Sequence, residues 1–185
     1  QAQIHHNRIA SEDAIIISNS IANHGIAIMS QREGLEFETD IVSDTRPLNH
    51  IVKKLLDHFG EDIKFLRDAT RGGVASVLNE VAEITGLGIE IEQTRLPVDP
   101  QVEGACEMLG FDPLYVANEG VFIAVVKKEI ADKVVSVLQN DEATKKASLI
   151  GIINNLTPKK VLLKSKIGGR RVVNYLTGEQ LPRIC

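Results

Sequence analysis

Apolar residues recur along this chain with two different spacings, which predicts a mixture of β-strands and α-helices. Short continuous or alternating apolar runs predict strands at residues 14–18, 63–66, 88–92, 121–126 and 149–153. Apolar residues three and four positions apart predict helices at residues 48–59, 72–85 and 130–138. Strands and helices therefore alternate along most of the chain.

Two helix ends carry typical capping residues. Gly86 follows the helix at residues 72–85, and glycine readily adopts the left-handed conformation that ends many helices. A further helix is expected to begin at Asp99-Pro100 and to end near Gly110. The Asp99 carboxylate suits the N-cap position, and proline suits the first helical turn.

The last part of the chain has a different character. Apolar runs at residues 161–163 and 171–173 flank Gly168-Gly169, which predicts a hairpin. The segment after Tyr175, LTGEQLPRIC, has no periodic apolar face and is expected to be an exposed, flexible tail. The predicted organisation is an interdomain-linker remnant at residues 1–12, one domain at residues 13–176 and a mobile tail at residues 177–185. Because the chain opens on Gln1 rather than on Met, we expect it to be part of a longer protein.

Composition excludes several functional classes. With 185 residues, of which 43% are hydrophobic, the chain can bury a core as a single domain. Its formal net charge of −4 provides no field that would attract nucleic acid. No apolar run is long enough to span a membrane, and the two cysteines lack the spacing of a zinc site or a disulfide framework. A reducing cytoplasm is the expected location.

The segment Asp68-Ala69-Thr70-Arg71-Gly72-Gly73 separates a predicted strand from a predicted helix. The N–H groups and the positive dipole end of such a helix suit an anion, to which Arg71 could add a bidentate contact. Asp68 and Thr70 could instead simply cap the helix. The segment is neither a Walker loop nor a dinucleotide-binding fingerprint.

Glu119 lies in Asn118-Glu119-Gly120, just before the strand at residues 121–126. A carboxylate at the mouth of a strand can act as a general base if burial raises its pKa. Most glutamates are merely solvated, and this alternative stays open.

Cys185 places a thiol at the end of the given sequence, where Arg183 favours the reactive thiolate and the terminal carboxylate opposes it. Alternatively, Cys185 stands at the end of the sequence only through an accident of cloning or truncation. Cys106, on the apolar side of its helix, is expected in the core. His24, in the turn before Gly25, is the one histidine with a possible functional place; the five histidines show no metal-ligand spacing.

A basic cluster surrounds the predicted hairpin turn and could dock a partner or a phosphate. Alternatively, these charges protect an exposed sheet edge. The cluster comprises Lys164, Lys166, Arg170 and Arg171.

Five stretches together resemble the hydrogenase expression/formation family HypE, from about Asp13 to Cys185. These stretches are IANHGIAIMSQREGLEF, SDTRPLN, LRDATRGGVASVLNEVAE, CEMLGFDPLYVANEG and LPRIC. The DATRGG motif alone would indicate only the wider AIR-synthase-related superfamily, which includes selenophosphate synthetase. LPRIC narrows the resemblance to HypE. The alternative to an enzyme is a non-catalytic domain whose tail merely docks a partner.

The resemblance implies an α+β fold, the AIR-synthase-like C-terminal domain, with helices packed on a mixed β-sheet. It also implies ATP-dependent dehydration of a carbamoyl group on Cys185 to a thiocyanate, which supplies cyanide ligands during nickel–iron hydrogenase maturation. The implied cofactors are ATP and Mg²⁺. The implied partners are the carbamoyltransferase HypF, the HypC–HypD scaffold complex and, at full length, a second copy in a homodimer.

By the same resemblance, Glu119 is the candidate base beside the modified cysteine. The residues expected to line the cleft and to contact nucleotide, phosphate or tail are His24, Asp68, Thr70, Arg71, Gly72 and Gly73. Where the family usually reads Ser-Gly-Thr-Ile-Gly-Asp-His-Gly, this chain reads Ser18-Asn19-Ser20-Ile21-Ala22-Asn23-His24-Gly25. The family's N-terminal domain, which supplies most ATP and magnesium contacts, is not part of the given chain, so the chain alone is expected to be inactive.

Overall fold

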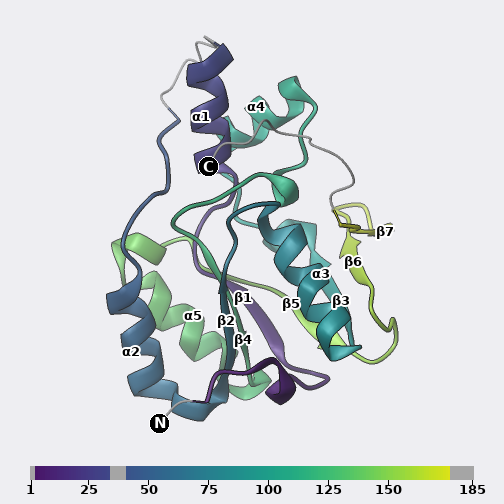
Figure 1. Ribbon diagram of the computed structural model, residues 1–185. Helices are drawn as coiled ribbons and strands as arrows, with labels where there is room; N and C mark the ends of the chain where they lie inside the picture. The colour runs from purple at the N-terminus through teal and green to yellow at the C-terminus, as the bar shows by residue number, and fades with distance from the viewer. Residues whose placement is uncertain (1–2, 34–40, 176–185) are drawn as a thin grey trace.

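The computed structural model describes residues 3–33 and 41–175. Its described strands form one sheet in the order β2-β4-β1-β5-β3-β6-β7 (Figure 1). The pair β3–β6 is parallel, and the other neighbouring pairs are antiparallel. The sheet is therefore mixed, as expected. The strands are β1 (Ala14–Ile17), β2 (Ile63–Asp68), β3 (Gly88–Glu92), β4 (Phe122–Val126), β5 (Ser148–Asn154), β6 (Val161–Lys164) and β7 (Arg170–Val172).

Helices cover both faces of this sheet. Along β1, Ile15 and Ile17 belong to the core cluster that includes α3, whereas Ala14 and Ile16 belong to the cluster that includes α2 and α5. Figure 1 shows α3 on one side of the strands and the pair α2 and α5 on the other. A strand covered on both faces reads as a continuous apolar run, which explains the uninterrupted Ala14–Ile17 and Phe122–Val126 segments. The helices are α1 (Asn23–Glu33), α2 (Asn49–Phe59), α3 (Gly73–Thr85), α4 (Pro100–Leu109) and α5 (Ala131–Gln139).

A third, smaller core cluster joins α1 to α4 beyond one end of the sheet. It contains Ala22 just before α1, Ile26 from α1, Val102 and Cys106 from α4, and Val116 from the segment before β4. In Figure 1 these two helices stand together above the strands. The cluster thereby holds the N-terminus of α1 close to the sheet end where β1 and β2 finish.

The predicted strands, the hairpin and the three predicted amphipathic helices are all present, with ends shifted by a few residues. Gly86 ends α3 with φ 73° and an N–H bonded to the Ala82 carbonyl, as predicted. One prediction was wrong: the turn predicted around His24 is the first turn of α1. Asp99 is the N-cap of α4, as predicted, but its side chain makes no capping hydrogen bond.

The segment before β1, predicted as a linker remnant, packs on the domain from residue 3 onward. The His5 N–H donates to the Lys64 carbonyl oxygen over 3.0 Å, and the Glu12 N–H donates to the Ile153 carbonyl oxygen over 2.9 Å. Ile9 is part of the core cluster around α3. The domain boundary at residue 12 stays a prediction.

Candidate functional site

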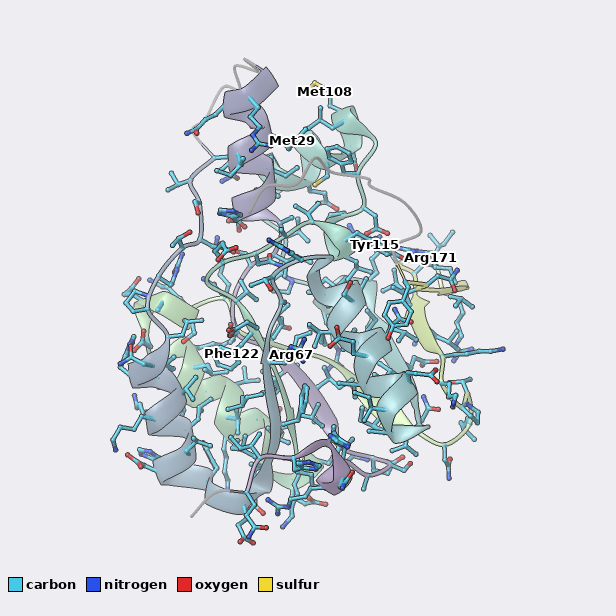
Figure 2. The ribbon with its side chains drawn as sticks, viewed as in Figure 1. Met29, Arg67, Met108, Tyr115, Phe122 and Arg171 are labelled. Atoms are coloured by element: carbon cyan, nitrogen blue, oxygen red, sulfur yellow. The ribbon has the colours of Figure 1, made fainter. Side chains whose placement is uncertain are left out.

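Four connecting segments meet at one end of the sheet. β1 and β2 both finish there and β4 begins there, because β4 is antiparallel to both neighbours and pairs Asp68 with Phe122. Figure 2 labels Arg67 and Phe122, which mark the end of β2 and the start of β4. The fold thus gathers residues far apart in sequence. The segments are residues 18–22, 43–46, 69–72 and 117–120.

Asn118 joins three of these segments and is fully buried. Its side-chain oxygen accepts the Ala22 N–H over 2.8 Å, and its amide nitrogen donates to the Ala69 carbonyl over 2.7 Å and to the Val116 carbonyl over 3.2 Å. A buried amide whose hydrogen bonds are all made specifies one arrangement of its neighbours. The start of α1, the DATRGG segment and the segment before β4 are therefore fixed relative to one another.

Asp44 fixes the fourth segment to the candidate base. One carboxylate oxygen, Oδ1, accepts the backbone N–H groups of Glu119 over 2.9 Å and of Gly120 over 3.2 Å. The other, Oδ2, is buried and has no hydrogen-bond partner among the described residues. Burial raises the pKa of the Asp44 carboxyl, although the two backbone hydrogen bonds and the nearby His24 and Arg46 act in the opposite direction.

Close packing also explains Gly120. A Cβ at that position would stand 1.9 Å from the Asp44 carbonyl oxygen, so the two backbones can approach only because glycine has no side chain. Asp44 was not predicted as a site residue. Its stretch, SDTRPLN, contributed only to the resemblance to HypE.

The DATRGG segment forms a strand–turn–helix junction, as predicted. Gly72, at φ 71°, is the N-cap of α3, and no side chain caps this helix end. The alternative that Asp68 and Thr70 cap the helix is therefore wrong. Gly73, at φ 61°, packs so closely that a Cβ would lie 2.5 Å from the Leu114 carbonyl oxygen.

The side chains of this junction differ in exposure. Asp68 and Arg71 are exposed and Thr70 is half-buried, next to the positive dipole end of α3. The arrangement supplies backbone N–H groups, a guanidinium and a carboxylate on one accessible surface. Such a surface can hold a phosphate group against the helix N-terminus.

The structure brings Glu119 and His24 to this same sheet end. The Glu119 side chain is exposed, so the burial on which the general-base argument depended is not provided by the described residues. His24 is half-buried, and its Nδ1 lies 2.9 Å from the Ser43 hydroxyl, next in sequence to Asp44. The three predicted elements of the site, His24, Glu119 and the DATRGG junction, are thus neighbours through Asn118 and Asp44.

The N-terminus of α1 carries a further polar cluster. Asp99 accepts hydrogen bonds from Asn23 over 3.1 Å and from Ser20 over 3.4 Å, and it pairs with Lys146. Burial acts to raise the pKa of Asp99, but these hydrogen bonds and the Lys146 charge outweigh it and lower the pKa. An aspartate at position 23 would face Asp99, so the asparagine found here suits its partner.

Ala22 stands where the resembling family usually has glycine, and it has a φ of 72°. The left-handed conformation costs an alanine about 1 kcal/mol or more. The chain therefore keeps the backbone geometry of a glycine-containing loop without the glycine.

The two cysteines differ in what the structure describes of them. Cys185 lies outside the described residues, so its place and its role stay predictions. Cys106 is buried, as predicted, and burial with the nearby Asp112 and Glu103 raises the pKa of its thiol to about 11.

Three of the four residues of the basic hairpin cluster form ion pairs. Lys166 pairs with Glu103 over 3.1 Å, Arg170 with Glu90 over 2.8 Å, and Arg171 with Asp112. These pairs support the reading that the charges cover the β7 edge of the sheet.

A family model described as AIR synthase related protein, C-terminal domain, matches residues 10–163 of the chain. The chain belongs to the AIR-synthase-related family. The α+β fold predicted from the resemblance is thereby confirmed, and the site at the sheet end is a site of an AIR-synthase-related C-terminal domain.

Within this family, the similarity to HypE proteins is confirmed. The carbamoyl dehydratase HypE of Rhizobium leguminosarum bv. viciae is 47% identical over 173 residues, which cover 94% of this chain and 49% of that protein. A HypE–HypF complex matches with a TM-score of 0.89 and 41% identity, over 94% of this chain and 56% of the matched one. A HypE in complex with ATP matches with a TM-score of 0.91 and 39% identity, over 98% and 55%.

The chain spans about half the length of the curated relatives it matches. Within residues 3–33 and 41–175, no group of three or more His, Cys, Asp or Glu side chains is placed to hold a metal ion. The α3 N-terminus and Arg71 fit a phosphate group. None of the described helices has the length and apolar character of a membrane span.

Proposed function

We propose that this chain is the C-terminal half of an ATP-dependent carbamoyl dehydratase that acts in nickel–iron hydrogenase maturation. The observation that carries the proposal is the meeting of His24, Glu119 and the DATRGG junction at one sheet end. This site lies in a chain 47% identical over 173 residues to a carbamoyl dehydratase HypE.

In the proposed reaction the Cys185 sulfur carries a carbamoyl group as a thiocarboxamide, delivered by a HypF-type carbamoyltransferase. The amide oxygen attacks the terminal phosphorus of ATP, ADP departs, and the nitrogen loses one proton. The second N–H proton then passes to a base while the C–O bond breaks and phosphate leaves, which produces a thiocyanate on sulfur. An amide oxygen is a poor leaving group, so its conversion to a phosphate ester makes the dehydration feasible.

The residues of this chain have distinct roles in that scheme. Glu119 is the proposed base that takes the proton from nitrogen, and its backbone is held by Asp44. Arg71 and the first turn of α3 hold phosphate. Most contacts to ATP and Mg²⁺ are assigned to the half of the protein outside this chain.

The exposure of the Glu119 side chain is consistent with its proposed role as the base. Its carboxylate is accessible in the given chain. A base that must reach a substrate on another segment has to be accessible before that segment arrives, and the second half of the protein then supplies desolvation. The product's cyano group passes to iron on a HypC–HypD scaffold, and homodimerisation at full length and a cytoplasmic location complete the proposal.

The proposal is tested by incubating the full-length protein with its carbamoyltransferase, carbamoyl phosphate and Mg-ATP, followed by mass analysis of the C-terminal peptide. The expected products are a carbamoylated Cys185 without ATP and a species lighter by one water with ATP. A selenophosphate-synthetase-like enzyme or a docking domain would yield neither species, and that outcome would sink the proposal.

A further inference from the structure

A cavity of about 360 Å³ lies away from the DATRGG site, among α4, the turn after β3, the segment after α4 and the β6–β7 hairpin. One wall is apolar and the rim is charged, which is the combination found where a short peptide docks. The apolar wall consists of Leu96, Val98, Cys106, Phe111, Leu114 and Leu163.

The charges at the rim are unequal. Glu103 pairs with Lys166 over 3.1 Å, and Asp112 pairs with Arg171. Glu107 also lines the cavity, is exposed, and has no ion pair within the described part of the chain. The rim therefore offers one unmatched negative charge above an apolar floor, which selects an apolar segment carrying a single cation.

The edge of the sheet brings such a segment to this cavity. Val173 is buried and its N–H donates to the Val161 carbonyl over 2.8 Å, so the chain is anchored up to that point beside β6. Three residues of the same hairpin, Leu163, Lys166 and Arg171, line the cavity. Figure 2 shows Arg171 beside the turn that carries Tyr115, in agreement with the Arg171–Asp112 pair.

We propose that the cavity is the docking site of the chain's own C-terminal segment, Leu176–Cys185. This segment lies outside the described residues; its sequence, LTGEQLPRIC, contains two leucines, a proline and an isoleucine, with a single cation, Arg183, next to the proline and an acidic residue, Glu179, nearer its start. Ten residues reach up to about 33 Å when extended, and the segment begins only five residues after Arg171, which itself lines the cavity. The leucine and isoleucine side chains cover the apolar wall, and Arg183 pairs with Glu107.

The proposal does not rest on the dehydration chemistry, because docking requires no carbamoyl group and no ATP. Covalent attachment makes the binding intramolecular, with an effective concentration in the millimolar range for a short connection. A weak contact is therefore sufficient to keep the tail on the domain until a partner with higher affinity takes it.

The test uses a fluorescent peptide of residues 176–185 carrying Cys185→Ser, which prevents disulfide formation. Its anisotropy is titrated with the complete chain and with a chain that stops after Tyr175. The described fold, with all three core clusters, lies before that point, and a melting curve confirms that the shortened chain is folded. The peptide should bind the shortened chain at least about tenfold more tightly than the complete chain, whose own tail competes.

A charge exchange makes the test specific. Glu107→Arg in the shortened chain should weaken peptide binding about tenfold, and a peptide with Arg183→Glu should regain binding to that variant. Met108→Arg is the matched control, since Met108 is the next residue, is exposed, and does not line the cavity. Absence of peptide binding to the shortened chain, equal binding to both chains, or indifference to Glu107→Arg would each overturn the proposal.

Discussion

Asn118 and Glu119 are neighbours in sequence, yet they belong to two different regions of the site. Asn118 is fully buried and connects three segments of the chain, whereas the side chain of Glu119 is exposed. The same contrast separates Gly73 and Asp44, which are packed against backbone, from Asp68 and Arg71, which face solvent. The buried group builds the platform, and the exposed group carries the charged side chains proposed for the chemistry. Substitution of the buried residues should therefore lower stability, whereas substitution of the exposed residues should impair the reaction and leave stability nearly unchanged.

The largest expected effect is the loss of the modified thiol. Cys185→Ala in the full-length protein should abolish carbamoyl acceptance, because no other side chain of the tail is comparably nucleophilic at neutral pH. The melting temperature should stay unchanged if the tail is exposed, as the sequence predicts, since substitutions in exposed segments usually alter stability by less than about 0.5 kcal/mol. Labelling with radioactive carbamoyl phosphate measures the first effect. Undiminished labelling would show that the modified-tail mechanism is wrong.

The second effect tests the exposed member of the pair. Glu119→Gln in the full-length protein should still accept carbamoyl on Cys185 but should stall before thiocyanate, because an amide keeps the shape and cannot take the proton. Stability should remain within about 0.5 kcal/mol, as for other exposed positions. Mass analysis of the C-terminal peptide distinguishes the two species. Normal dehydration by the variant would place the base elsewhere.

The third effect tests the platform. Gly73→Ala should lower the free energy of unfolding by about 3 kcal/mol or more, because the new methyl group meets the Leu114 carbonyl oxygen and the backbone is left-handed. Gly86→Ala is the matched control, with a similar φ of 73° but open space around its Cα. It should cost only about 1 kcal/mol. Urea unfolding measures both, and equal costs would show that close packing is not what requires Gly73.

The smallest effect concerns the pH dependence of stability. Burial raises the pKa of Asp44 in the folded state above its unfolded value, so the folded protein binds this proton more tightly. The stabilising contribution is present below the unfolded pKa and is lost as the pH rises through the folded one. Asp44→Asn should remove this fall while keeping an oxygen for the Glu119 and Gly120 N–H groups. Urea unfolding from acidic to neutral pH, compared with the unsubstituted chain, provides the measurement; an unchanged slope would contradict the raised pKa.

Local patterns predicted most of the elements because each strand and amphipathic helix is encoded by its own apolar spacing. The helix α1 escaped prediction because its sequence, NHGIAIMSQRE, has little amphipathic contrast and follows a left-handed Ala22. The order of the sheet could not be predicted, since the parallel pairing of β3 with β6 joins segments separated by about 70 residues.

For the site, the DATRGG junction, His24 and Glu119 were found in the sequence, and the structure places them at one sheet end. Asp44 was not found, because nothing in its local sequence reveals that its carboxylate accepts two backbone N–H groups across the fold. Residues that position others act through distant contacts, and such contacts leave no local pattern. Residues with reactive groups, by contrast, stand out by their chemical type.

The burial of Cys106 has a practical consequence for spectroscopy. A thiol with 1% of its surface exposed and a pKa of about 11 reacts very slowly with alkylating reagents at neutral pH. Of the two cysteines in the given sequence, Cys106 should therefore contribute nothing to rapid labelling with a maleimide dye. Because a dye and a carbamoyl group would occupy the same sulfur, protection of Cys185 from the dye provides a measure of its carbamoylation.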